Sequence, residues 1–401
     1  MKNVKDLQVE GKVVLCRCDF NVPIKGGVIR DDNRIVAALP TIKELVSKGA
    51  KIVLMSHLGK IKHKEAPEVV AEQKAKNNLE PVAVRLGELL PEVKVSFCPA
   101  TRGEELKAAV ASLNNGEIVV VQNTRYEKGE SKNCPELSKE WASLADAFVM
   151  DAFGSAHRAH ASTYGIPSIL KEEGKQVALG YLVEKEVVSL GKVVNCEERP
   201  FVAILGGFKV SDKIKVINAL LEKCDKIIIG GAMAYTFVKA LGGEIGISPC
   251  EVDQLDYARE MYASGKILLP VDSVVASDFD NPTEVKVCET NAIPEGFEGL
   301  DIGPKTREIY AAEIAKAKTV FWNGPMGVFE KEAYQAGTIA VCKACAELED
   351  AFTVIGGGDS AAACKQFGYK DEFSHVSTGG GASLEMIENN GHLPGIDVIG
   401  E

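Results

Sequence analysis

Short apolar runs alternate with amphipathic segments along this 401-residue chain, and the alternation restricts the fold to a narrow class. The run at 12–18 (KVVLCRC) precedes a helix-like segment at 31–49, and a second apolar run follows at 50–56. Further runs of the same kind lie at 117–123, 201–207, 226–231, 319–324 and 352–358. Buried strands separated by helices are typical of parallel sheets with both faces covered.

The strand-like runs fall into two successive sets, which predicts two α/β domains. The length agrees, because a chain of this size holds about two domains. We therefore expect two domains of similar size, each with a mainly parallel sheet flanked by helices. Between the two sets, residues 168–194 read as one helix with charged residues on one side and Leu and Val on the other. We expect this segment to be a stiff connector and a hinge.

Composition excludes several classes of protein. The formal charge is 46 − 57 = −11, which argues against a nucleic-acid scaffold or a binder of anionic membranes. The sequence has no uncharged apolar run long enough to span a membrane, and its first residues lack the apolar centre of a signal peptide. Eleven cysteines without a secretion signal indicate reduced thiols in a cytoplasmic protein. The lone pair Cys342 and Cys345 lacks a zinc-binding counterpart and is expected to pack in a core.

Arginine is unevenly distributed. Of ten arginines, eight lie in the first half of the chain. The guanidinium fork suits phosphate and carboxylate groups, so the first half has the side chains for an anion site. Surface solubility explains the same count equally well.

The residues that follow the predicted strands carry the functional signal, because ligands of parallel α/β folds bind beyond the carboxyl ends of the strands. In the first half these residues are cationic or hydrogen-bonding: Asp19, Asn21, His57, Arg125, His157, Arg158 and His160. In the second half they are mostly glycines: 206–207, 230–231, 324, 356–358 and 379–381. The first half is suited to a small polyanion held by side chains. The second is suited to a flat or phosphate-bearing ligand lying against backbone.

Three glycine segments of the second half can each be interpreted in more than one way. In LGGFKVSDKI (205–214), Lys209 and Lys213 are four residues apart and would share one face of a helix, which suggests a phosphate site. The segment 355–368 contains a G-x-G-x-x-A pattern that fits a dinucleotide site, a tight turn, or a nucleotide site with Asp359 on Mg²⁺. The segment 377–385 (STGGGASLE) places three glycines where a helix N-terminus would bind an anion.

Eight segments, taken together, resemble a known family. They are RCDFNVP (17–23), SHLGK (56–60), DAFGSAHRAHAST (151–163), GGFKVSDKI (206–214), GLDIGPKT (299–306), WNGPMGVFE (322–330), GGGDS (356–360) and STGGGASLE (377–385). In this order they look like the signature segments of phosphoglycerate kinases, and the resemblance runs essentially end to end. It implies Mg-dependent, reversible phosphoryl transfer between 1,3-bisphosphoglycerate and ADP, giving 3-phosphoglycerate and ATP in glycolysis.

The resemblance also implies a domain organisation. Residues 1–170 would bind phosphoglycerate, 171–190 would form the connecting helix, and 191–388 would bind the nucleotide. The tail at 389–401 would pack back toward the N-terminal domain. The two domains would face each other across a hinged cleft and close before transfer, because substrates on separate domains react only once brought into line. Residues 168–194 and 379–381 are the hinge candidates.

The family's binding residues carry over motif by motif. The phosphoglycerate would be bound by Asp19, Asn21, Arg34, His57, Lys60, Arg125 and Arg158, with Arg17 adding positive field. The nucleotide would be bound by Gly207, Lys209, Lys213, Gly231, Gly299, Asn323, Pro325, Glu330, Gly357, Gly358, Asp359 and Ser360. Asp359 would hold Mg²⁺. The transferring phosphoryl group would be stabilised by Arg34, Lys209, Gly380 and Gly381.

Four positions depart from the family's pattern. Phe208 stands where a small residue is usual, and its ring would either crowd the nucleotide or pack away from it. Lys60 replaces an arginine, Ala232 the third of three glycines, and Ser360 a threonine. The segment 61–80 matches least and is expected to be a polar loop or irregular helix without a site.

Two other functions remain open from the residues alone. The 356–361 pattern would fit an NAD-dependent dehydrogenase, and Phe208 would fit a non-catalytic binding protein that has kept the fold. The resemblance itself favours a monomeric cytoplasmic kinase that binds small molecules, without a nucleic-acid or membrane partner.

Overall fold

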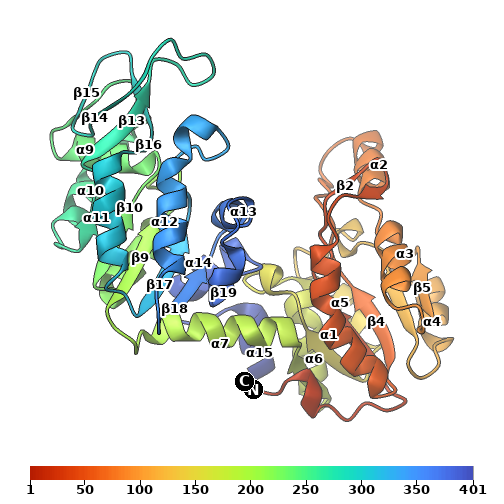
Figure 1. The fold of residues 1–401 in the computed structure, drawn as a ribbon. Helices are drawn as coiled ribbons and strands as arrows, with labels where there is room; N and C mark the ends of the chain where they lie inside the picture. The colour runs from red at the N-terminus through yellow and green to blue at the C-terminus, as the bar shows by residue number, and fades with distance from the viewer. Residues whose placement is uncertain (401) are drawn as a thin grey trace. The chain divides into compact units, whose positions relative to one another are not determined.

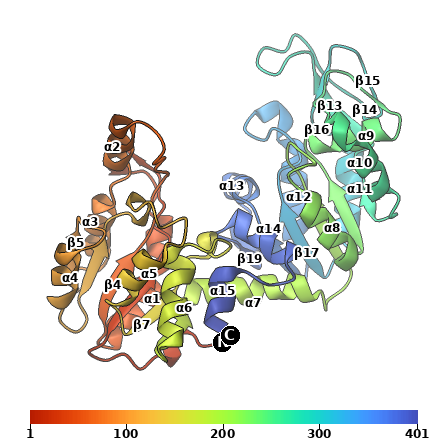
Figure 2. The same ribbon diagram turned by 180° about the vertical axis from the view of Figure 1, so that it is seen from behind.

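The computed structural model describes residues 1–400, which form two compact units. The N-terminal unit comprises Met1–Val187 together with residues 392–400, and the C-terminal unit comprises Val188–Gly391. Each unit contains a six-stranded sheet with helices on its faces (Figures 1 and 2). No helix in the described part of the chain is long and apolar enough to cross a bilayer.

The sheet of the N-terminal unit is entirely parallel. From edge to edge its strands are β5 (Val95–Cys98), β6 (Ile118–Val121), β4 (Lys51–Met55), β1 (Val13–Arg17), β7 (Ala147–Met150) and β8 (Gln176–Leu179). A short hairpin is formed by β2 (Ile24–Lys25) and β3 (Val28–Ile29). The helices are α1 (Asn33–Ser47), α2 (Pro67–Lys76), α3 (Glu80–Leu89), α4 (Glu104–Ala111), α5 (Pro135–Ala142), α6 (Ile166–Glu172) and α15 (Pro394–Gly400).

Burial along the central strands explains why helices cover both faces of this sheet. Val14 and Cys16 of β1 belong to one apolar cluster with residues of α1 and α3. Leu15 lies between them in sequence, so its side chain points to the other face, and it too is fully buried. Figures 1 and 2 show α5 and α6 on that second face. The apolar runs therefore form strands of a sheet that is buried on both sides.

The C-terminal unit also has a six-stranded parallel sheet, with a different strand order, and adds smaller sheets. Its parallel sheet has the order β12 (Ile267–Leu268), β10 (Lys226–Ile229), β9 (Phe201–Leu205), β17 (Thr319–Asn323), β18 (Phe352–Ile355) and β19 (His375–Val376). An antiparallel sheet joins β14 (Val285–Glu289), β13 (Asp272–Ala276) and β16 (Glu298–Ile302), and β11 (Glu244–Ile245) pairs with β15 (Ala292–Ile293). The helices are α8 (Ile214–Lys223), α9 (Met233–Ala240), α10 (Leu255–Tyr262), α11 (Pro304–Ile314), α12 (Ala336–Ala346), α13 (Gly358–Gln366) and α14 (Gly380–Glu388).

The core of the C-terminal unit lies between its parallel sheet and α11 and α12. Trp322 of β17, Tyr310 of α11 and Val341 of α12 belong to the same buried cluster. Cys342 and Cys345 lie in this cluster as well, in agreement with the packing role predicted for them.

The single helix predicted over 168–194, and the connecting helix placed at 171–190, are wrong in one respect. Helix α6 ends at Glu172, Gly174 adopts a φ of +73°, and β8 then pairs with β7 at the edge of the sheet. Only α7 (Tyr181–Asn195) is the continuous helix, and the boundary between the two units falls inside it. A short apolar run such as Val177–Leu179 is compatible with either a helix or a strand. Pairing with β7 makes it a strand in the folded chain.

Two other segments complete the chain. The polar segment 61–80 contains a regular helix, α2, where a loop or irregular helix was expected. The C-terminal helix α15 packs against α6 and β8, so residues 392–400 belong to the N-terminal unit.

Candidate active site

One edge of the N-terminal sheet gathers the residues that follow its strands. The backbone continues the pairing of β1 and β4 beyond their ends, since the Cys18 N–H donates to the Met55 carbonyl at 2.9 Å. The Thr124 N–H, after β6, donates to the Ser56 carbonyl at 3.0 Å, and the Phe20 N–H donates to Ser56 Oγ at 2.8 Å. These bonds bring the loops after β1, β4 and β6 together.

Arg17 is the buried centre of this edge. Its Nε donates to Ser162 Oγ at 2.8 Å, its Nη1 donates to the Cys18 carbonyl, and its Nη2 lies 3.0 Å from His57 Nδ1. Ser162 in turn donates to the buried carboxylate of Glu130 at 2.7 Å. Burial lowers the pKa of Arg17, and the nearby carboxylate of Glu130 partly opposes that shift. Arg17 is therefore fixed in position and holds the neighbouring imidazole.

His57 is a neutral donor in this arrangement. Burial, followed by the positive charges of Arg17, Arg125 and Arg34, holds its pKa well below the usual value. A guanidinium has only donors, so Nδ1 accepts from Arg17 and the proton of the neutral ring lies on Nε2. The ring thus keeps one N–H for another partner.

Asp19, Asn21 and Arg34 form a second group at the same edge. Arg34 Nη1, from the first turn of α1, lies 3.1 and 3.2 Å from the two carboxylate oxygens of Asp19. The Asn21 N–H donates to Asp19 Oδ1 at 3.1 Å, and Asn21 Oδ1 accepts from the Gly59 N–H at 2.8 Å. The side chain of Arg34 is 42% exposed, so it is positioned without being enclosed.

Arg125 and Arg158 complete the positive cluster. Arg125 Nη1 donates to the Gly59 carbonyl at 2.5 Å. Burial lowers the pKa of Arg125, and the charges of Arg17 and Arg158 lower it further. Burial also lowers the pKa of His160 to about 4, with Arg17, Arg125 and Arg158 acting in the same direction. Arg34, Arg125 and Arg158, which are distant from one another in the sequence, therefore act on one small region. Lys60 lies exposed at the turn after β4.

In the C-terminal unit, the corresponding edge is built from backbone. The Gly206 N–H donates to the Asn323 carbonyl at 2.9 Å, and the Gly231 N–H donates to the Met326 carbonyl at 3.0 Å. A Cβ on Gly206 would lie 2.0 Å from the Pro325 carbonyl oxygen, and one on Gly231 would lie 2.7 Å from Gly207 N. The three loops that follow β9, β10 and β17 approach one another so closely here that there is no room for a side chain at Gly206 or Gly231.

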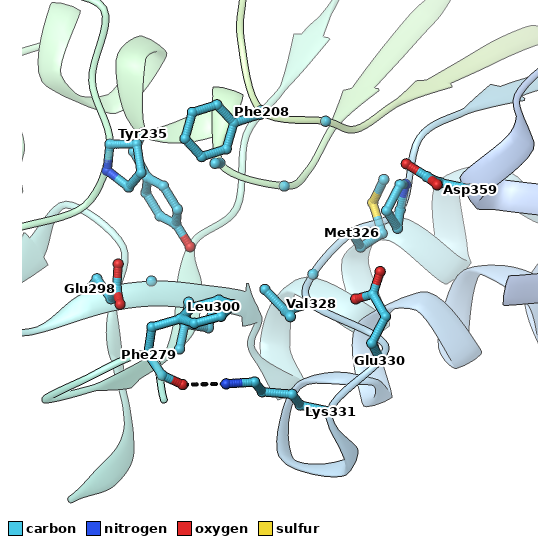
Figure 3. A pocket seen from close by; sticks show the side chains of 17 residues that line it. Phe208, Tyr235, Phe279, Glu298, Leu300, Met326, Val328, Glu330, Lys331 and Asp359 are labelled. Carbon is cyan, nitrogen blue, oxygen red and sulfur yellow. Dashed lines mark hydrogen bonds between the residues drawn. The ribbon is translucent and has the colours of Figure 1, made fainter. Parts of the chain in front are cut away.

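These loops border a cavity of about 590 Å³ (Figure 3). Six residues predicted for the nucleotide lie in its wall: Gly207, Gly231, Gly299, Pro325, Glu330 and Asp359. The wall also contains residues that sequence reasoning missed, among them Tyr235, Phe279, Glu298, Leu300, Met326, Val328 and Lys331. Leu300, Met326 and Val328 belong to the family segments quoted above, so their place in those segments could have identified them. Tyr235 and Phe279 lie outside those segments.

Lys209 and Lys213 do not share a helical face, so that part of the prediction is wrong. Residues 206–213 form a turn in which Gly207 has a φ of +132°, and α8 begins only at Ile214. Lys213 Nζ donates to Asn323 Oδ1, and Asn323 Nδ2 donates to the Gly356 carbonyl at 2.7 Å. Burial lowers the pKa of Lys213, while Asp212 and Asp359 oppose that shift. Lys209 is exposed and outside the cavity wall.

Two helix N-termini meet beside these residues. Helix α13 begins at Gly358 and α14 at Gly380, and a Cβ on Gly380 would lie 3.4 Å from Gly357 Cα. Ser360 Oγ accepts from the Gly324 N–H at 3.0 Å, which ties α13 to the loop after β17. The free N–H groups at the start of a helix and the helix dipole both favour an anion. Gly357, Gly358, Gly380 and Gly381 lie where such an anion would bind.

Asp359 is the residue of this group suited to a metal ion. It is exposed in the first turn of α13 and lies in the cavity wall. Mg²⁺ is usually held by one or two carboxylates together with phosphate oxygens and water. Among residues 1–400, no group of three or more metal-ligating side chains gathers at one point. A single carboxylate beside a phosphate site therefore fits an ion brought in with a nucleotide.

Comparison with known proteins gives consistent matches over the whole chain. A family model described as phosphoglycerate kinase matches residues 4–390. A phosphoglycerate kinase of Clostridium novyi is 56% identical over 406 aligned residues, which cover 100% of this chain and 98% of the relative. One of Enterococcus faecalis is 53% identical, with coverage of 100% and 99%. The solved structure of a phosphoglycerate kinase from Coxiella burnetii has a TM-score of 0.87 at 38% identity, covering 98% of this chain and 97% of that one.

Proposed function

Because the chain belongs to the phosphoglycerate kinase family, we propose that its two units divide this family's reaction between them. The chain is a glycolytic phosphotransferase that moves a phosphoryl group reversibly between 1,3-bisphosphoglycerate and ADP, with a carboxyl group as acceptor. The NAD-dependent dehydrogenase and the non-catalytic binding protein are thereby set aside. The G-x-G-x-x-A pattern at 356–361 spans the short turn after β18 and the first residues of α13.

The N-terminal unit binds the phosphoglycerate in this proposal. The observation that carries it is the cluster of Arg34, Arg125 and Arg158 around buried Arg17, an excess of positive charge in an acidic chain. His57 would donate from Nε2, and Asp19 and Asn21 would receive the hydroxyl group of the ligand. Lys60 would contribute a further positive charge from the turn after β4.

The C-terminal unit binds the nucleotide in this proposal. The base would occupy the apolar part of the cavity beside Gly207, Gly231, Gly299 and Pro325, and Glu330 would accept from the ribose hydroxyls. The phosphates would extend toward Lys213, Asn323 and Ser360, near Gly357 and Gly358 at the start of α13. Asp359 would hold Mg²⁺, which neutralises phosphate charge when it is bound.

Transfer needs positioning and charge stabilisation rather than a covalent enzyme intermediate. The carboxylate oxygen of 3-phosphoglycerate attacks the γ-phosphorus of ATP in line as the bond to the ADP oxygen breaks. Charge on the transferring oxygens is the main target for catalysis. Lys209, Arg34 and the N–H groups of Gly380 and Gly381 are proposed to supply that stabilisation. Exposure leaves Lys209 free to move toward the transferring group.

Three finer features belong to the same proposal. The units approach each other when both substrates are bound, because in-line transfer requires direct contact between the reactants. The enzyme acts as a monomer in the cytoplasm, in keeping with its reduced cysteines and its small-molecule substrates. Its net charge of −11 disfavours nucleic acid and anionic membranes as partners.

One experiment tests the division between units. Turnover is measured with saturating 3-phosphoglycerate and ATP in a coupled assay, and the binding of each substrate is measured separately by calorimetry. We expect turnover, with substitutions in the arginine cluster weakening phosphoglycerate binding but not ATP binding, and substitutions in the cavity weakening ATP binding but not phosphoglycerate binding. Turnover with the two effects interchanged would contradict the assignment of sites.

A further inference from the structure

We propose that Phe208 is a stacking wall for the nucleotide base, so that its ring determines affinity for nucleotides and leaves affinity for phosphate unchanged. The proposal rests on the proposed nucleotide site in the C-terminal unit. It concerns a side chain that the motifs around it do not explain, since the residues on either side act through backbone or through charge.

The backbone around Phe208 is held firmly at the rim of the cavity. The Met233 N–H, at the start of α9, donates to the Gly207 carbonyl at 3.0 Å. The preceding residue, Gly206, is fixed by its bond to the Asn323 carbonyl. The φ of +132° at Gly207 then turns the chain so that the next side chain projects toward α9. In Figure 3 the ring of Phe208 lies beside Tyr235 of that helix.

The ring is a wall of the cavity and does not fill it. Phe208 lines a cavity that measures about 590 Å³ with the ring in place, within the usual range for small-ligand sites. The side chain is nevertheless 63% exposed, so most of its apolar surface is free to contact a ligand. Single exposed aromatic residues are common on protein surfaces, and exposure alone would carry no inference. Here the exposed ring borders a concave site.

The opposite side of the cavity is aliphatic. Figure 3 shows Leu300 and Val328 across the cavity from Phe208, with Met326 at one side. The side chains of Glu330 and Asp359 lie on the side of Met326, away from the ring. A planar base between an aromatic ring and aliphatic side chains would bury both of its faces, while the ribose and phosphates would extend toward the carboxylates. Stacking of this kind tolerates different bases, because every base has a π-face.

The competing interpretation is that the ring crowds the nucleotide. The two interpretations predict opposite results for Phe208→Ala: removal of a stacking wall weakens ADP binding, whereas removal of an obstruction strengthens it. The experiment measures the Kd of ADP and of inorganic tripolyphosphate, a probe without a base, for the wild type and for Phe208→Ala. Thermal melting of each variant establishes that it is folded.

We expect Phe208→Ala to raise the Kd of ADP about five- to twentyfold, at the low end of measured base stacking because the ring is exposed. The Kd of tripolyphosphate should stay within about twofold. Phe208→Trp should retain ADP affinity, and its indole fluorescence should respond to ADP because both native tryptophans, Trp141 and Trp322, are fully buried. Tyr262→Ala, which removes an exposed aromatic ring outside the cavity wall, is the matched control.

A further variant separates failure of this inference from failure of the site. Val328→Trp would fill the cavity opposite Phe208 and should abolish ADP binding if the base lies there. An unchanged or lower Kd for ADP in Phe208→Ala, with ADP binding lost in Val328→Trp, would overturn the stacking role and leave the site in place. Normal ADP binding in both variants would overturn the nucleotide site itself, and the stacking proposal with it.

Discussion

Both units contain a six-stranded parallel sheet, with different strand orders, yet one builds its site mainly from side chains and the other mainly from backbone. At the carboxyl edge of the N-terminal sheet, long side chains converge, and the charges of the arginines add to burial in lowering the pKa values of His57 and Arg125. At the carboxyl edge of the C-terminal sheet, main-chain loops pack so closely that a single Cβ would collide with backbone. In a site made of side chains, one substitution removes one charge or one contact. In a site made of backbone, one substitution can change the conformation of a whole loop.

The largest effect is expected at Lys209, a charged side chain on the backbone-built side. If its ammonium stabilises the transferring phosphoryl group, Lys209→Ala should lower kcat roughly 10²–10³-fold, equivalent to about 3–4 kcal/mol. The Kd of 3-phosphoglycerate should be unchanged. Steady-state kinetics with both substrates provides the measurement, and Lys215→Ala, which removes an exposed lysine of α8, is the control. A Lys209→Ala enzyme with more than half of the wild-type kcat would contradict this role.

A smaller effect is expected from a methyl group in the backbone site. In Gly231→Ala the new Cβ would lie 2.7 Å from Gly207 N, at a φ of +69°. We expect the loops to separate and the Kd of ATP to rise on the order of tenfold or more, because a left-handed conformation costs about 1–2 kcal/mol before the collision is counted. Gly265→Ala has a similar φ of +76° with no atom within 4 Å, so it isolates the conformational cost. Equal ATP affinity in the two variants would show that close packing of these loops is not required.

Arg34→Ala tests the side-chain site in the same way. Loss of one charge-assisted contact should raise the KM for 3-phosphoglycerate by about tenfold, since such bonds contribute about 1.5–3 kcal/mol and Arg34 is partly exposed. The Kd of ATP should stay constant. Arg85→Ala is the matched control, because that arginine pairs with Asp32 and Glu88 at the surface of the same unit. A changed ATP affinity together with normal phosphoglycerate kinetics would contradict the assignment of Arg34.

The sequence predicts the sheets and the strand-end residues well because both depend on local patterns. Arg34, Arg125 and His57 were found by their positions after strands or by motif, and they do gather in one region. The alignment of Lys209 with Lys213 failed because the chain turns at Gly207, whose carbonyl accepts from the Met233 N–H, a partner that is distant in the sequence. The aromatic residues Tyr235 and Phe279 were missed for the same reason, since only the folded chain brings them to the cavity.

The last comparison concerns a buried carboxyl in each unit. Asp151, after β7, accepts from the Leu182 N–H at the start of α7 at 3.1 Å, and its Oδ2 has no hydrogen-bond partner. Asp301 of β16 accepts from the Gly337 N–H at the start of α12 at 2.8 Å. Burial raises the pKa of each to about 7. Each carboxyl therefore supports the start of a helix and is protonated in the folded state well above the pH at which it ionises in the unfolded chain.

The sign of the resulting pH dependence follows from proton binding. Between about pH 4 and pH 7 the folded state holds a proton on Asp151 that the unfolded state has lost, so this group's contribution to stability falls as pH rises. His57 and His160 in the same unit act oppositely, because burial lowers the pKa of both and the unfolded chain binds protons that the folded state does not. In Asp151→Asn, the two histidines should therefore determine how the stability of the N-terminal unit depends on pH. Denaturant unfolding at pH 5 and pH 7 should show that the wild type loses stability relative to Asp151→Asn by about 1.4 kcal/mol per pH unit. Asp301→Asn should produce the same difference, confined to the unfolding of the C-terminal unit within the full chain. If the stability of the wild type and of both variants changed in parallel with pH, neither carboxyl would be protonated in the folded enzyme.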